Sequence, residues 1–136
     1  MKGNPGDPAD WHKVALIDLD RARRNLGEGD LCATTLWLEQ CAEKAVKGWL
    51  IGQGWALVKT HDLERLCNEV GQRGTDVSWF LPSAIRLRQL YFTDRYVDDS
   101  PDPEPDEAEC RQLLTDVEQL VTTLFPPPPP STQTAP

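Results

Sequence analysis

The chain has 136 residues, which is long enough for one domain with a buried core and too short for two. Its composition, with 39% hydrophobic and 26% charged residues, is ordinary for a soluble globular protein. No apolar run approaches the roughly 20 residues of a membrane-spanning helix, and no basic and apolar leader begins the chain. We therefore expect a cytoplasmic protein that does not enter a membrane.

The formal net charge of −8 is unevenly distributed. Residues 98–109 carry only acidic charges, whereas residues 73–95 carry four arginines against two aspartates. The net charge therefore does not exclude an anionic ligand, because a local basic surface can form on an acidic protein.

Apolar residues at three- and four-residue spacing predict helices, and no run has the alternation of a strand. Asp7 and Pro8 are a typical N-cap and first helical residue, and Asp30 is placed to cap the second helix. We expect Thr60 to cap the third helix. Pro82 either opens the fourth helix or separates it from a short turn before it. The expected helices cover residues 8–26, 31–51, 61–70, 83–96 and 106–124.

These elements predict an all-α fold, an antiparallel up-and-down bundle of four main helices plus a short additional helix. We expect a flexible leader at residues 1–7 and the bundle at residues 8–125. The proline-rich tail at residues 126–136 is expected to be disordered or in the polyproline II conformation.

The second helix places one acidic residue in an unusual position. Its polar residues, including Glu43 and Lys47, are expected mostly on the face away from the apolar one. Glu39 instead falls between Val46 and Leu50 at the edge of the apolar face. A carboxylate is costly to bury there unless a cation or a hydrogen-bond donor meets it.

Three segments together resemble the HEPN family (higher eukaryotes and prokaryotes nucleotide-binding domain). They are the helix LWLEQCAEKAVKGWLI at residues 36–51, KTHDL at residues 59–63 and the Arg-Tyr pair at residues 95–96. The resemblance extends from about Asp10 to Leu124. It implies a homodimer with a cleft at its interface, and often a nucleotidyltransferase encoded next door as a partner.

The resemblance also directs attention to Arg95. In ribonuclease members of the family, an arginine at the end of this helix is followed four to six residues later by a histidine. The arginine stabilises charge on the phosphorane and the histidine transfers protons. Here no histidine follows Arg95 anywhere in the chain. We therefore expect nucleotide or RNA binding without robust nuclease activity.

Aromatic residues lie between the arginines of the fourth helix. Arg88 and Arg95 are seven residues apart and share a helix face, which suits phosphate binding and base stacking. We expect Arg95 to be the main phosphate contact and Tyr91 and Tyr96 to stack or orient the ligand. Glu39 is expected to pair with Arg95 or Arg88 and to orient Arg95.

The remaining candidates lie elsewhere in the chain. Lys59, near the start of the third helix, could help to hold an anion there. His61 either forms a structural hydrogen bond across the turn or serves as a ligand or base. His12 is expected to pack or to lie on the surface. Asp18 and Asn25 are weaker additions to the group around Glu39.

No spacing of residues indicates a metal site or a phosphate-binding glycine-rich loop, so we expect no cofactor. The four cysteines do not match zinc-ligand patterns and are expected to be free thiols. Two alternatives to a binding module stay open. One is a toxin-type, metal-independent endoribonuclease of a toxin–antitoxin pair that uses Arg95 with a displaced base. The other is a scaffold whose acidic loop and proline-rich tail dock a partner.

Overall fold

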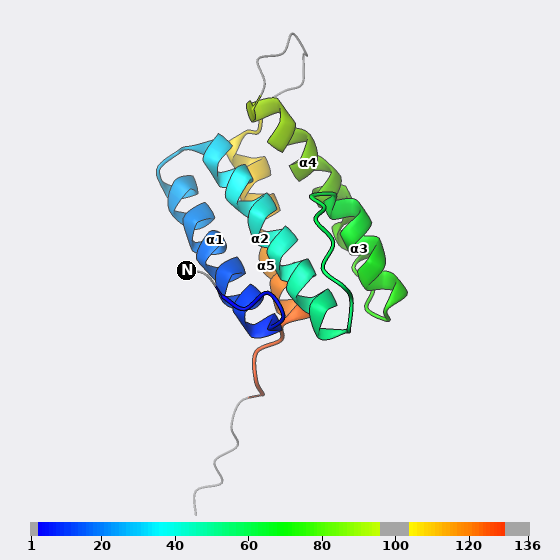
Figure 1. Ribbon diagram of the computed structural model, residues 1–136. Coiled ribbons are helices and arrows are strands. Elements are labelled where there is room, and N and C mark those ends of the chain that lie inside the picture. The colour runs from blue at the N-terminus through cyan, green and yellow to red at the C-terminus, as the bar shows by residue number, and fades with distance from the viewer. Residues whose placement is uncertain (1–2, 96–103, 130–136) are drawn as a thin grey trace, which may run out of the picture.

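The protein is an all-helical bundle whose long helices run alternately up and down (Figure 1). The computed structural model describes residues 3–95 and 104–129, except for the side chains of residues 92–95, and this part contains no strand. Its elements are α1 (Pro8–Gly27), α2 (Leu31–Gly52), α3 (Leu63–Gln72), the 3-10 turn η1 (Ser78–Phe80), α4 (Leu81–Arg95) and α5 (Glu107–Leu124). The predicted fold class, four main helices and a short one, is confirmed.

Aspartates cap four of these helices, as their free N-terminal amides require. Asp7 accepts a hydrogen bond from the amide of Ala9, and Asp30 accepts one from the amide of Ala33. Thr60, which we expected to cap α3, does not do so. Asp62 is the cap instead, and its own amide donates to the Thr60 hydroxyl at 3.2 Å. The helix therefore begins later in the chain, and His61 lies before it.

The start of α4 settles the two alternatives for Pro82. This residue is the second of α4, where its missing amide hydrogen costs no helical hydrogen bond, so it lies within the opening turn. The apolar residues before it form η1, and the side chain of Phe80 at the end of this turn is fully buried.

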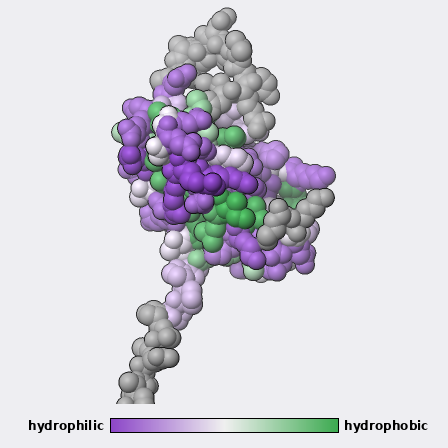
Figure 2. Space-filling view, turned by 90° about the vertical axis from the view of Figure 1, so that its left-hand side faces the viewer, coloured by the Kyte–Doolittle hydropathy of each residue, from purple (hydrophilic) through white to green (hydrophobic). Residues whose placement is uncertain are grey.

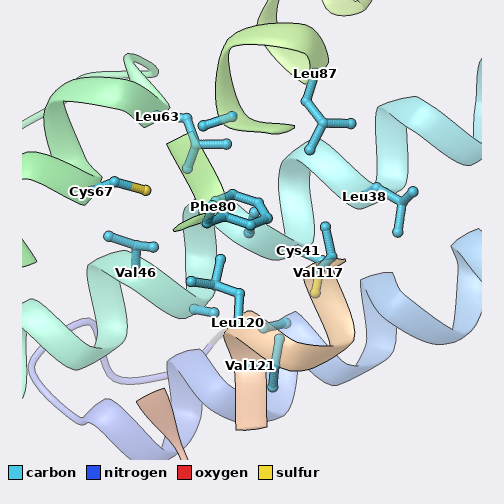
Figure 3. Close-up of a cluster of buried hydrophobic side chains, with 14 of the residues drawn as sticks. Leu38, Cys41, Val46, Leu63, Cys67, Phe80, Leu87, Val117, Leu120 and Val121 are labelled. Carbon is cyan, nitrogen blue, oxygen red and sulfur yellow. The ribbon is translucent and has the colours of Figure 1, made fainter. Parts of the chain in front are cut away.

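The core lies where α2 meets the other helices. Figure 3 shows Phe80 at its centre, between Leu63 of α3 and Leu120 of α5, with Leu87 of α4 nearby. All four side chains are fully buried. Helix α2 packs against α1, α3, α4 and α5, so it is the central helix of the bundle.

Helix α1 packs closely against α2 at Gly48. A Cβ atom at Gly48 would lie 2.4 Å from the Cβ of Trp11, so only glycine allows this approach. The described part of the leader also contacts α1, because the Trp11 indole donates to the carbonyl of Pro5 at 2.9 Å. Figure 2 faces the α1 side and shows an apolar patch among hydrophilic residues. Leu16 and Ile17 of α1 are exposed.

The connector between α2 and α3 positions the candidate site. It leaves the end of α2, where the amide of Trp55 donates to the carbonyl of Leu50, and returns alongside α2 to the start of α3 (Figure 1). His61, near the end of this connector, thereby contacts Glu43 in the middle of α2. A loop thus covers polar residues of α2 that would otherwise face solvent.

Candidate functional site

Charged side chains of α2, of residues 61–62 and of α4 form contacts that follow one another along the chain. We name this group the α2–α4 polar cluster. It joins α2, the end of the connector with the cap of α3, and α4 through described ion pairs and hydrogen bonds. Its members are Glu39, Glu43, Lys47, His61, Asp62 and Arg88.

Glu43 is the centre of the cluster. Its Oε1 accepts a hydrogen bond from Lys47 Nζ at 2.6 Å and lies 2.8 Å from Nδ1 of His61. Both Glu43 and Lys47 are buried. The pairing offsets the cost of removing the two charges from water, since a buried charge without a partner is far more costly. The second oxygen, Oε2, is buried and has no donor within the described residues.

Glu39 lies one turn before Glu43 and is only 4% exposed. The Gln40 amide donates to its Oε2 at 2.9 Å. Burial and, to a smaller extent, the negative charge of Glu43 raise the pKa of Glu39 to about 7. Glu39 is therefore protonated in a large fraction of molecules near neutrality. The protonated form can donate to Glu43, whose Oε2 needs a donor.

His61 connects the buried part of the cluster to solvent. Its side chain is 80% exposed, although its Nδ1 contacts the buried Glu43. An ionised carboxylate only accepts hydrogen bonds, so Nδ1 carries the proton when the ring is neutral. Nε2 then holds the basic lone pair on the exposed ring.

Asp62, the residue after His61 in the chain, forms an ion pair with Arg88 of α4. Arg88 Nη1 lies 2.9 Å from Asp62 Oδ1. The pKa of Asp62 is held below its usual range, chiefly by the hydrogen bond from the Arg65 amide and further by Arg88. One carboxylate therefore caps α3 and holds α4 beside it.

Of the predicted site residues, the structure brings Glu39 and His61 together beside Glu43, whereas Arg88 pairs with Asp62, the residue after His61. Tyr91, three residues after Arg88, is half-buried on α4, and Lys59 is exposed on the connector. Lys59 lies three residues before the actual cap of α3. Arg95 ends α4, but its side chain and all of Tyr96 lie outside the described residues. The expected contact between Glu39 and Arg95 stays a prediction.

The expectation that Glu43 and Lys47 lie on a solvated face is wrong. Both are buried, because the connector returns along this side of α2 and brings His61 over Glu43. The helical wheel carries a partial signal, since Glu43 and Lys47 are only about 40° and 80° from Glu39. The wheel alone cannot show that a loop covers them.

Asp18 belongs to a second polar group, between α1 and α2. It is fully buried and pairs with Lys44 Nζ at 2.5 Å and Arg21 Nη1 at 2.9 Å. The Arg21 guanidinium in turn lies 4.6 Å from the centre of the Trp37 ring. This group ties α1 to α2. Asn25 lines a shallow hollow beside Arg21 and Trp37.

His12 packs as expected, because its ring stacks on Phe125 with centroids 4.4 Å apart. Within the described ranges, no three histidine, cysteine, aspartate or glutamate side chains are grouped so that they could hold a metal ion. None of the described helices is long and apolar enough to cross a membrane. Much of the acidic loop and the end of the proline-rich tail lie outside the described residues, so the docking expected of them is not addressed.

Comparison with known proteins identifies the fold. A family model described as the HEPN domain matches residues 9–125. The chain is also similar to a crystal structure described as an archaeal HEPN homologue, with 26% sequence identity and a TM-score of 0.68. That similarity covers 91% of this chain and 96% of the other. No curated protein matches the chain.

Proposed function

The chain belongs to the HEPN family, and we propose that it binds a nucleotide or single-stranded RNA along α4 beside the α2–α4 polar cluster. In this proposal Arg88 and Arg95 contact phosphate groups and Tyr91 stacks on a base. The observation that carries the proposal is the position of Arg88, whose side chain is 45% exposed and held by Asp62.

The ion pair between Arg88 and Asp62 is suitable for exchange with a ligand. Both side chains are at least one-third exposed, and exposed pairs of this kind contribute only about 0–1 kcal/mol. A phosphate that forms two charged hydrogen bonds with the guanidinium provides more than the exchange costs. Exchange of the Asp62 carboxylate for a ligand phosphate at Arg88 therefore costs little stability.

The neighbouring acidic residues do not repel an anion as strongly as their number suggests. Glu39 carries its charge in only part of the molecules near pH 7, and the charge of Glu43 is balanced by Lys47. Arg95 follows Arg88 by seven residues, so about 10 Å of helix separates two arginines on one face. This spacing supports binding of more than one phosphate group.

The family relationship also supports a homodimer with a shared cleft and a nucleotidyltransferase partner, and both belong to the proposal. We do not include cleavage by the arginine–histidine pair of ribonuclease members, because no histidine follows Arg95.

Binding is tested with the full chain and with fluorescently labelled ATP and single-stranded RNA at low salt, because phosphate contacts weaken as salt rises. Arg88→Ala and Arg95→Ala are each expected to weaken binding about tenfold or more, since each removes a charge-assisted hydrogen bond. The matched control is Arg24→Ala on α1, whose described pair is the exposed Asp20.

The proposal is wrong if the wild-type chain binds neither probe at low salt. It is also wrong if both variants on α4 bind as tightly as the control. Light scattering of the same samples gives the oligomeric state, and a monomer at all concentrations tested would exclude the homodimer.

A further inference from the structure

An open hollow lies between the described part of the leader and the first turns of α1. Its lining is mostly apolar, and none of the lining residues belongs to α4 or to the α2–α4 polar cluster. We name it the Trp11 hollow. The residues that line it are Gly3, Asn4, Pro5, Asp10, Trp11 and Val14.

Hydrogen bonds fix the leader side of this hollow against α1. The amide of Asn4 donates to Asp10 Oδ2 at 2.8 Å, and the Trp11 indole donates to the carbonyl of Pro5 at 2.9 Å. Within the leader, the amide of Gly6 donates to the side-chain oxygen of Asn4 at 2.9 Å. The wall of the hollow is therefore formed before any ligand arrives, which lowers the entropic cost of binding.

The hollow is suited to an uncharged, apolar ligand. Asp10 is the one charged residue among those that line it, so an anionic ligand would meet a like charge. The apolar surface also continues along α1, since Ile17, one turn after Val14, is exposed. Figure 2 shows an apolar patch on this side of the molecule. Burial of that surface by an apolar ligand is favourable.

The chain itself contains a segment with these properties. Pro126–Pro130 are five consecutive prolines, and residues 125–136 have no charged side chain. Consecutive prolines favour the polyproline II conformation, which packs its rings on aromatic side chains at a low entropic cost. Pro126–Pro129 are all exposed, so their rings are open to a partner.

The path of this segment favours a second copy of the chain as its partner. Phe125, which ends α5, stacks on His12, the residue after Trp11, so tail and hollow lie at the same end of the bundle. Figure 1 shows Pro126–Pro129 leaving this end and running away from it. Five prolines span about 15 Å in polyproline II, enough to project onto another molecule. Two copies that face each other with this end can exchange tails reciprocally, as two-fold symmetry requires.

We propose that the proline-rich tail of one copy binds in the Trp11 hollow of a second copy, with reciprocal exchange of the two tails. The proline rings pack on Trp11 and Val14. This contact uses neither α4 nor the α2–α4 polar cluster, so it is independent of the proposed binding of a nucleotide or RNA.

The test mixes two forms of the full chain. In the tail variant, Pro127→Gly, Pro128→Gly and Pro129→Gly remove the rigid rings from exposed positions, which leaves the bundle unchanged. The tail variant is labelled with nitrogen-15, and unlabelled wild type is added. We expect the NMR signals of the Trp11 indole and the Val14 amide to shift until they saturate. Unlabelled tail variant is the matched control and should shift neither signal.

The hollow is tested by a substitution in the labelled tail variant. Val14→Asp is expected to weaken binding of the wild-type tail about tenfold or more, because it places a charge in an apolar contact. The control is Ile85→Asp, which makes the same kind of change at an exposed apolar residue of α4 and should leave binding unchanged. The chain has five tryptophans, and the indole signals other than that of Trp11 report whether each variant is folded.

Three results would overturn the inference. If added wild type shifts neither signal, and the signals of wild type and tail variant also coincide, the hollow has another occupant. If those two forms differ at every dilution while added wild type has no effect, the tail binds within its own molecule. If folded Val14→Asp binds as tightly as Ile85→Asp, the contact lies outside the hollow.

Discussion

Glu39→Gln is expected to stabilise the protein at alkaline pH and to leave it unchanged under mildly acidic conditions. Glutamine has nearly the same shape as protonated glutamate and cannot ionise. Its amide can donate to Glu43, as the protonated carboxyl does. The substitution therefore removes only the cost of the buried charge.

The magnitude follows from the pKa of Glu39. Burial raises it from 4.5 to about 7 in the folded chain, and each pKa unit corresponds to about 1.4 kcal/mol. Between these two pH values the folded chain holds a proton that the unfolded chain has lost, so the free energy of unfolding falls as pH rises. The loss is complete above pH 7 and amounts to about 3 kcal/mol at most. Glu39→Gln should recover up to that amount at pH 8 and nothing at pH 4.

The assay is urea unfolding of wild type and variant at several pH values between 4 and 8. The difference between the two proteins matters, because it cancels other titrating groups. Glu28→Gln, at an exposed position, is the control and should give a constant difference. If Glu39→Gln gives the same constant difference, the pKa of Glu39 is the same in the folded and the unfolded chain, and the cost attributed to its burial is refuted.

Two further substitutions test the packing around α2. Gly48→Ala should lower the free energy of unfolding by about 1–3 kcal/mol, because its Cβ would lie 2.4 Å from that of Trp11. Gly27→Ala, which has nothing within 4 Å, should be neutral or stabilising, and equal effects in thermal unfolding would contradict the close approach. Lys47→Met should cost about 3 kcal/mol because Glu43 loses a buried partner, and adding Glu43→Leu should recover most of it. A double variant as unstable as the single one would contradict this pairing.

Local sequence was sufficient to predict the helices because their signals are local. Apolar spacing of three and four residues, together with Asp7 and Asp30 as caps, depends on residues within one turn. The error at Thr60 has the same local origin, since threonine and aspartate both cap helices and the sequence offers both within three residues. In the structure Asp62 is the cap, and it also forms an ion pair with Arg88 of α4. A tertiary contact thus accompanies the choice between two acceptable caps.

The candidate site was less predictable because it depends on the path of a connector. Glu39 could be identified from the wheel, since its position beside Val46 and Leu50 is fixed by helix geometry. Whether Glu43 lies in water or under a loop depends instead on where residues 53–62 run, and no local pattern specifies that path. Long-range placement, rather than helix formation, limited the prediction.

The connector also determines where His61 lies. The chain has no histidine after Arg95, yet the connector that covers Glu43 brings His61 to that carboxylate and leaves the ring exposed. The path of the connector therefore determines both the contact at Glu43 and the position of His61. A change that frees the connector should expose Glu43 and release His61 together, whereas a change at Arg95 should affect neither. The Glu43–His61 contact and the arginines of α4 can consequently be separated by mutation.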